Sequence, residues 1–354
     1  MIYLDYAATS PIDTEVLKAM QPYLTKHFGN PSSLYSIGKE ARKAVETARE
    51  QVANAINAKP EQIFFTSGAS ESNNWVCSNF DRVLCSPYEH HSILNRPNTI
   101  EMRTFAPLAN DIFRHLPNLV SHMWINNETG AIYDIKEIAK ISHDMNVPLH
   151  TDATQVLGHL NIDVKEIDCD FLSLSGHKFK APKGIGVLYI KEPDKFKPLI
   201  YGGRQEHNLR AGTENVAAIV GIGKAAELFH IPHNTFRCIE IQNQFVKAFS
   251  DIKDVHFNTD IENSIPTTLN IAFKGVESEV LMLLLDRDGI CVSSGSACNS
   301  GSLEPSHVLK AIGCPEEYIY NSIRLSWDET LSDADIEYTI ECIKKNVEKV
   351  RGYI

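Results

Sequence analysis

Apolar residues recur at helical spacing in the first part of the chain. Val16 and Met20 follow Asp13, a residue type that commonly caps a helix, and a longer pattern of the same period runs over residues 41–56. Such spacing places apolar side chains on one face of a helix. The pattern therefore predicts two early helices, and similar spacing predicts further helices near residues 71–76 and 135–141.

Short apolar runs alternate with these helices. Each run ends in small or polar residues, as a buried strand does. The runs lie at residues 62–65, 119–125, 147–150, 170–174 and 184–190. Strands that alternate with helices in this way form a mainly parallel sheet covered by helices. The sequence therefore predicts an α/β fold.

The pattern changes after about residue 231. A helical stretch leads to apolar runs at residues 268–273, 280–285 and 322–327, and a closing helix is predicted over residues 336–347. We interpret this part as a smaller α+β domain. A length of 354 residues also favours two domains over one.

Composition limits the possible partners. The formal net charge of -11 argues against a nucleic-acid partner, because phosphate binding needs an excess of Lys and Arg. No stretch approaches the length of a membrane span, and the first residues lack the features of a signal peptide, so we expect a cytoplasmic protein. The eight cysteines include no C-x-x-C pair, so the sequence indicates no zinc site.

The segment 173–178 presents Ser, His and Lys directly after a predicted strand. Hydroxyls, an imidazole and backbone N–H groups could hold a phosphate there, and the amine of Lys178 could form a Schiff base with an aldehyde cofactor such as pyridoxal phosphate (PLP). Without that context, Lys178 is a solvated surface lysine.

The segment 150–155 follows another predicted strand, where open α/β sheets place their ligands. Asp152 could pair with a protonated pyridine nitrogen, and Gln155 is within reach of the same pocket. The alternative role for Asp152 is a helix cap.

Two further segments fit the same kind of ligand. Residues 66–70 offer backbone amides and a hydroxyl at the start of a predicted helix, which favours an anion. His90 follows a short strand-like run and could stack on a planar ring, although a histidine in such a place is usually a structural residue.

Cys298 and Arg324 suggest chemistry on a substrate. Cys298 lies within the small, polar segment 293–302, which is typical of a loop from which a nucleophile can reach its target; an inert loop thiol is the alternative. Arg324 lies in an apolar strand, where a substrate carboxylate or an internal Asp or Glu would satisfy its charge.

Taken together, these motifs resemble the cysteine desulfurases of the NifS/IscS type, within the class V aminotransferase group of fold-type I PLP enzymes. The match covers nearly the whole chain, and its motifs occur in the order found in that family. They lie at residues 3–9, 28–33, 66–72, 126–130, 152–155, 175–178 and 293–298.

The resemblance implies a large PLP-binding domain with a mainly parallel seven-stranded sheet over residues 12–232, and a smaller α+β domain formed by 1–11 and 233–354. It implies that Lys178 carries the cofactor, that Asp152 pairs with its pyridine nitrogen and that His90 stacks on its ring. The other cofactor contacts that it implies are Ala69, Ser70, Asn127, Gln155, Ser175, His177 and Thr213, the last from the second subunit of a homodimer.

The implied reaction converts L-cysteine to L-alanine. Arg324 and Asn127 would bind the substrate, Lys178 would move its α-proton, and Cys298 would take the sulfur as a persulfide. An acceptor protein, such as an iron–sulfur scaffold, would then receive the sulfur for cluster or thio-cofactor synthesis.

Some positions depart from the family pattern. The segment 92–119 is shorter than usual, so we expect a reduced edge strand or helix, and Tyr35, Asn299 and Gly301 replace common residues. A selenocysteine lyase, an aminotransferase and a non-catalytic assembly subunit remain alternatives. The acceptor is not identified by the sequence.

Overall fold

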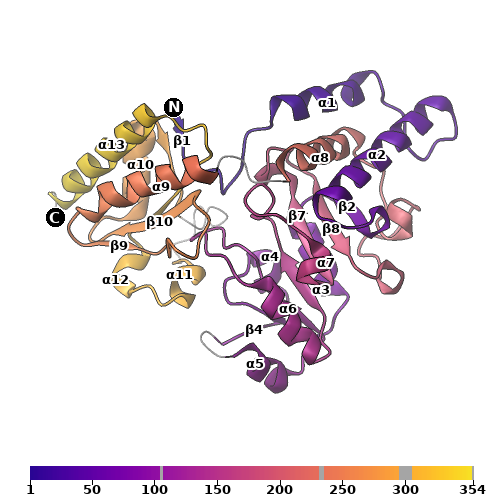
Figure 1. The fold of residues 1–354 in the computed structure, drawn as a ribbon, viewed down its shortest axis with the longest axis horizontal. Coiled ribbons are helices and arrows are strands. Elements are labelled where there is room, and N and C mark those ends of the chain that lie inside the picture. Colours follow the sequence, from indigo (N-terminus) through magenta and orange to yellow (C-terminus); the bar gives the residue numbers. More distant parts are fainter. Residues whose placement is uncertain (104–106, 231–234, 295–304, 353–354) are drawn as a thin grey trace. The chain divides into compact units, whose positions relative to one another are not determined.

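The computed structural model describes residues 1–103, 107–230, 235–294 and 305–352. The chain divides into two compact units (Figure 1). The larger unit consists of residues 10–124 and 133–232, and the smaller unit consists of 1–9, 125–132 and 233–354. The domain that the resemblance implies over residues 12–232 includes 125–132, whereas the structure groups this segment with the smaller unit.

The larger unit is built on a seven-stranded sheet with the strand order β2-β8-β7-β6-β5-β3-β4. Only β8 runs antiparallel to its neighbours, so the predicted mainly parallel sheet is confirmed. The strands are β2 (Ile63–Thr66), β3 (Val83–Cys85), β4 (Thr99–Glu101), β5 (Leu119–Ser121), β6 (Leu149–Asp152), β7 (Phe171–Ser175) and β8 (Gly186–Ile190). The edge strand β4 is retained in the short segment 92–119.

Helices cover this sheet. They are α1 (Thr14–Thr25), α2 (Ser36–Ala55), α3 (Ala69–Ser78), α4 (His91–Leu94), α5 (Leu108–His115), α6 (Ile135–Asp144), α7 (Val164–Ile167) and α8 (Val216–Phe229). Asp13 caps α1 as predicted, since its side chain accepts a hydrogen bond from the Glu15 N–H. Both α1 and α2 pack on α8, as Figure 1 shows. A Cβ atom at Gly223 would lie 2.6 Å from Ala48, so glycine allows α8 to approach α2 closely.

Strand register gathers the predicted motifs at one edge of the sheet. Thr66, Gly186 and Ser175 lie opposite one another across β2, β8 and β7. Asp152 pairs with Ser173 on the neighbouring parallel strand. Because β2, β6 and β7 run in the same direction, their carboxyl ends meet at this edge, where α/β sheets bind ligands.

One strand ends earlier than predicted. The apolar run 119–125 predicted a strand to Ile125, but β5 ends at Ser121. Beyond Ser121, the His122 and Trp124 N–H groups still donate to carbonyl oxygens of β6, whereas the Met123 N–H donates to the Glu89 carboxylate. The chain then enters the smaller unit at residue 125.

The smaller unit contains an antiparallel sheet of order β12-β10-β9 and a parallel pair, β1-β11. Leu269, Ile271 and Phe273 of β10 pack with apolar residues of α9, α10 and α13. Asn270, between them, points to the opposite side and donates to the Glu128 carbonyl oxygen. The elements are β1 (Ile2–Tyr3), α9 (Thr235–Ser250), β9 (Val255–Phe257), β10 (Thr268–Phe273), α10 (Ser278–Arg287), β11 (Ile290–Cys291), α11 (His307–Ala311), α12 (Glu316–Ile319), β12 (Ser322–Ser326) and α13 (Asp333–Arg351).

In the part of the chain that the structure describes, no helix combines the length and the apolar character needed to cross a membrane.

Candidate active site

Asp152 ends β6 at the ligand edge of the sheet and is 5% exposed. One carboxylate oxygen accepts a 2.7 Å hydrogen bond from Asn73 Nδ2, and the other accepts a 3.0 Å bond from the Thr154 N–H. Among the described residues, no cation pairs with Asp152. A buried carboxylate held only by neutral donors favours a cationic partner such as a pyridinium N–H.

His90 lies at the start of α4 and is half-buried. Its Nδ1 atom lies 2.8 Å from Ser92 Oγ and also accepts a 3.1 Å bond from the Ser92 N–H. Ser92 Oγ in turn accepts a 3.0 Å bond from Asn73 Nδ2. His90 and Asp152 are therefore joined through two intervening side chains.

The groups behind this edge are neutral at neutral pH. Burial lowers the pKa of His150 to about 4, and its two ring nitrogens lie within hydrogen-bonding distance of Ser121 and Ser173. Burial also raises the pKa of Glu89 to about 8, and the nearby Asp152 charge adds to this shift. Asp152 thus carries its negative charge in largely uncharged surroundings.

The loop before α3 carries the segment for which the sequence predicted an anion site. A Cβ atom at Gly186 would lie 2.6 Å from Gly68 Cα, so the loop can press against β8 because residue 186 has no side chain. Ser72 Oγ donates to the Val187 carbonyl oxygen and ties α3 to the same strand. Ala69 and Ser70 form the first turn of this ten-residue helix, whose backbone N–H groups favour an anion.

Lys178 and its neighbours follow β7 in a 3-10 turn, Gly176–Lys178. Ser175 is buried, whereas His177 and Lys178 are half-buried. The turn is fixed by the Ser10 N–H, which donates 2.8 Å to the His177 carbonyl oxygen. Burial, together with the nearby charges of Lys178 and Lys183, lowers the pKa of His177 to about 4, so its imidazole is neutral at neutral pH.

Gln155 and Thr213 lie in different surroundings. Gln155 is buried and follows Asp152 by three residues, whereas Thr213 is exposed. The loop that carries Thr213 is tied to α3 by Arg210, which makes a bidentate ion pair with Glu71 at 2.9 and 3.0 Å. The Thr213 loop is thus anchored to the helix that begins at the anion site.

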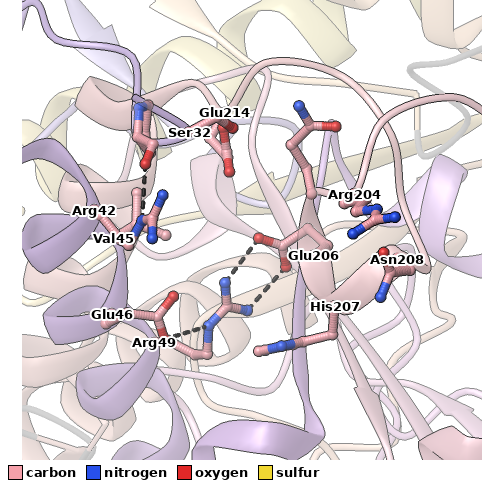
Figure 2. Close-up of a pocket in the computed structure, with 12 residues that line it drawn as sticks. Ser32, Arg42, Val45, Glu46, Arg49, Arg204, Glu206, His207, Asn208 and Glu214 are labelled. Atoms are coloured by element: carbon pink, nitrogen blue, oxygen red, sulfur yellow. Dashed lines mark hydrogen bonds and ion pairs between the residues drawn. The ribbon is translucent and has the colours of Figure 1, made fainter. Parts of the chain in front are cut away.

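A cavity of about 510 Å³ lies beside the same loop (Figure 2). Arg49 makes a bidentate ion pair with Glu206 on its wall, with both bonds at 2.8 Å. Glu206 also accepts from the Phe65 N–H of β2. Glu206, His207 and Asn208 all have positive φ angles, a conformation unfavourable for residues with a Cβ. The buried ion pair therefore holds a strained turn against β2.

These residues fit pyridoxal phosphate. Asp152 is a buried anion that would face the pyridine nitrogen, and the start of α3 would offer N–H donors to the phosphate. Lys178 follows the adjacent strand β7 and would offer an amine to the aldehyde. The larger unit therefore brings together the donor set that the cofactor requires.

The smaller unit holds the predicted substrate residues Arg324 and Asn127. Arg324 is 1% exposed, and its guanidinium donates at 2.6 Å to Asp5 Oδ1 and at 2.7 Å to the Asn127 carbonyl oxygen. The internal carboxylate that the sequence left open is therefore present, as Asp5. Asp5 belongs to the first motif of the sequence, but its role was not predicted.

Cys298 lies outside the described residues. Sequence reasoning also missed Asn73 and Ser92, which join Asp152 to His90. The sequence does offer one indication for Asn73. It lies at a buried position of a helix, and a buried amide needs a polar partner.

Comparison with known proteins gives consistent results. Residues 2–338 match the family model described as "Aminotransferase class-V". The chain is 42% identical to a cysteine desulfurase IscS of Dictyoglomus turgidum, with 99% of this chain and 95% of the relative covered. It also resembles the crystal structure of a NifS-like protein from Rickettsia africae, with a TM-score of 0.89, 32% identity, and 98% and 99% of the two chains covered.

A third similar structure is described as a complex with an amino acid. The structure titled "SspA in complex with cysteine" has a TM-score of 0.79 and 33% identity to this chain, and covers 92% of this chain and 98% of the other.

Proposed function

This chain belongs to the class-V aminotransferase family, and on that premise we propose that it is a PLP-dependent cysteine desulfurase, which converts L-cysteine to L-alanine and keeps the sulfur as a protein persulfide. The observation that carries the proposal is Asp152, a buried carboxylate with only neutral hydrogen-bond donors, at the same sheet edge as Lys178 and the start of α3. Similarity to relatives named cysteine desulfurase over almost the full length supports the choice of substrate.

The bound cofactor would supply an electron sink for the charge that develops when the α-proton of the substrate leaves. Asp152 would keep the pyridine nitrogen protonated, Ser70, Ser175 and His177 would hold the phosphate, and His90 would lie against the ring. Gln155 and Asn127 would contact the phenolic oxygen and the substrate. Arg324 would bind the substrate carboxylate with a guanidinium already oriented by Asp5.

Lys178 would take the α-proton and return it during the reaction. The Cys298 thiolate would attack the sulfur of the substrate, so that an S–S bond forms and the C–S bond breaks. The electron pair of the broken bond stays with the substrate carbon, which is protonated to the methyl group of alanine. Carbon is reduced and sulfur oxidised within the same step, so no external oxidant is needed.

A first experiment measures the visible absorption of the purified protein and its release of sulfide and alanine from L-cysteine with a reductant. We expect equal amounts of the two products from the wild type, no turnover from Lys178→Ala, and no sulfide from Cys298→Ala. Lys183→Ala and Cys291→Ala are matched controls, because Lys183 is an exposed lysine nearby and Cys291 is a half-buried thiol in β11. Alanine release that exceeds sulfide release, or sulfide release that does not depend on Cys298, would contradict the proposal.

The same assay separates the alternatives. A selenocysteine lyase would turn over L-selenocysteine far faster than L-cysteine and would not need Cys298. An aminotransferase would release a 2-oxo acid instead of alanine. A non-catalytic subunit would show no cofactor band.

We also propose that the enzyme acts as a homodimer in which Thr213 contributes to the phosphate site of the other subunit. Thr213 is exposed on a loop fixed by the ion pairs Arg210–Glu71 and Arg49–Glu206, as an interface residue requires. Mixing Lys178→Ala with Thr213→Ala protein would then restore activity, because one site of each mixed dimer has both residues intact. No recovery after subunit exchange would contradict this arrangement.

The cytoplasmic location and the acceptor of the sulfur, an iron–sulfur scaffold or similar protein, stay predictions.

A further inference from the structure

A continuous line of side-chain hydrogen bonds joins Asp152 to His90. Asn73 Nδ2 donates 2.7 Å to Asp152 Oδ2 and 3.0 Å to Ser92 Oγ. Ser92 Oγ lies 2.8 Å from His90 Nδ1. Two residues, Asn73 and Ser92, therefore connect the proposed pyridine partner to the proposed stacking imidazole.

The charge of Asp152 fixes the orientation of the Asn73 amide. An ionised carboxylate only accepts hydrogen bonds, so the Asn73 atom that faces it must be the nitrogen. The second hydrogen of the same nitrogen then points to Ser92 Oγ. Asn73 Oδ1 is left buried without a hydrogen-bond partner among the described residues, at a cost of about 1–3 kcal/mol. An amide kept in this orientation despite an unsatisfied oxygen indicates a role beyond packing.

The bonds from Ser92 define which nitrogen of His90 carries the proton. A backbone N–H can only donate, so the bond from the Ser92 N–H makes Nδ1 an acceptor. The Ser92 hydroxyl, whose oxygen accepts from Asn73, therefore directs its hydrogen at the same Nδ1 atom. The Ser92 N–H donates to the same Nδ1 atom at 3.1 Å. With two donors directed at it, Nδ1 carries no proton, and the neutral ring must carry its proton on Nε2.

We propose that Asn73 and Ser92 are positioning residues that hold the proton of His90 on Nε2 and fix the placement of His90 relative to Asp152. The inference rests on the proposed function, in which His90 and Asp152 both contact the cofactor. His90 then has a protonated Nε2 and an unprotonated Nδ1. Asn73 acts through its two neighbours, Asp152 and Ser92.

The test combines ring NMR with kinetics on holoenzyme labelled with 15N-histidine. Long-range proton–nitrogen spectra distinguish a protonated ring nitrogen from an unprotonated one, and His90→Asn identifies the His90 signals. We expect Nε2 protonated and Nδ1 unprotonated in the wild type. A protonated Nδ1 would overturn the proposal.

Three variants test the two ends of the relay separately. Asn73→Leu removes both donors, so we expect the His90 ring signals and the cofactor absorption band both to move, and kcat to fall about tenfold with KM within about twofold. Ser92→Ala removes only the hydroxyl, so we expect the ring signals to move, the cofactor band to stay, and kcat to fall about threefold. Ser92→Thr keeps a hydroxyl and should restore both.

Asn79→Ala is the matched control. Asn79 ends the same helix and makes three hydrogen bonds with backbone atoms of Trp75 and Lys197, so its loss should lower stability without moving the His90 signals. If Asn73→Leu leaves the His90 signals and the cofactor band unchanged, Asn73 is only a structural residue. The same conclusion holds if Asn79→Ala moves them by as much as Asn73→Leu does. The ring measurement needs no turnover, so failure to release sulfide would count against the proposed function alone.

Discussion

Asp152 in the larger unit and Arg324 in the smaller unit are both buried, charged and predicted to meet the same small molecules, yet their surroundings differ. The partners of Asp152 are a side-chain amide and a backbone N–H, which are both neutral. The guanidinium of Arg324 lies 2.6 Å from the carboxylate of Asp5. The charge of Asp152 thus has no opposite charge as a hydrogen-bond partner, whereas the charge of Arg324 has one.

This difference separates two ways of keeping a charge inside a protein. A charge held by neutral dipoles is solvated but not neutralised, so a ligand of opposite charge gains the full attraction when it arrives. A charge that already has a counter-ion is stable without the ligand, and a ligand must share it. Asp152 is therefore suited to a resident cofactor, and Arg324 to a substrate that comes and goes.

The largest expected effect concerns an ion pair in which both side chains are buried. Arg49 and Glu206 are both buried and bind each other bidentately, so removing the cation in Arg49→Met leaves a buried, unpaired carboxylate. We expect the free energy of unfolding to fall by about 3–5 kcal/mol, measured by urea denaturation. Glu46→Gln is the control, because Glu46 is the exposed partner of the same arginine and should contribute less than about 1 kcal/mol. Equal decreases in the free energy of unfolding for the two variants would show that burial does not determine how much these ion pairs contribute to stability.

The pH dependence of stability tests whether the surroundings of Asp152 are neutral. The folded-state pKa of Glu89 is raised by burial to about 8 from an ordinary 4.5, so the folded protein holds a proton that the unfolded chain has lost. The contribution of Glu89 is complete below about pH 4.5 and is lost as the pH rises to about 8. The stability of the wild type relative to Glu89→Gln should therefore fall by about 4 kcal/mol between these limits. A difference that does not change with pH would show that Glu89 is already ionised beside Asp152.

Neutralising Asp152 tests the first half of the comparison directly. Asp152→Asn keeps the shape but removes the charge that the cofactor ring would meet, and we expect turnover of L-cysteine to fall about a hundredfold. Asp163→Asn is the control, because Asp163 is a half-buried cap of α7, away from the predicted site residues in sequence, whose side chain accepts from two backbone N–H groups. A loss within about threefold for Asp152→Asn would remove the functional distinction between the two buried charges.

The smallest expected effect concerns the counter-ion in the smaller unit. The Asp5 side chain is 19% exposed, so Asp5→Asn should cost only about 1 kcal/mol of stability. Because the substrate carboxylate would no longer share the guanidinium, we expect KM for L-cysteine to fall about twofold, as measured by steady-state kinetics. A higher KM would mean instead that Asp5 orients Arg324 more than it competes with the substrate.

The elements that depend on local pattern were predictable from the sequence. The apolar run 268–273 coincides with β10, and the run 322–327 exceeds β12 by one residue. The apolar run 119–125 overran β5 by four residues. The His122 and Trp124 N–H groups still donate to β6, but the Met123 N–H between them donates to the Glu89 carboxylate. Periodicity reports burial, and a buried segment that bonds to a strand on one side only can end the sheet early.

The candidate site was predictable only where a residue carries its own chemistry. Asp152, Lys178 and His90 stand out as titratable groups after short strands, and register places the first two at one sheet edge. Asn73, Ser92 and Asp5 gain their roles from partners 19 to 319 residues away, which no local pattern encodes. These neutral or secondary residues determine how the recognised ones are held.

The pairing of β1 with β11 affects how this protein is made. Ile2 pairs with Ile290, so the first strand has no partner until most of the chain has been synthesised. At about 5–20 residues per second, the ribosome needs roughly 15–60 s to add the intervening residues. Residues 10–124 and 133–232 belong to a different unit and are complete earlier. The amino terminus is therefore the first part of the molecule to leave the ribosome and among the last to reach its final place.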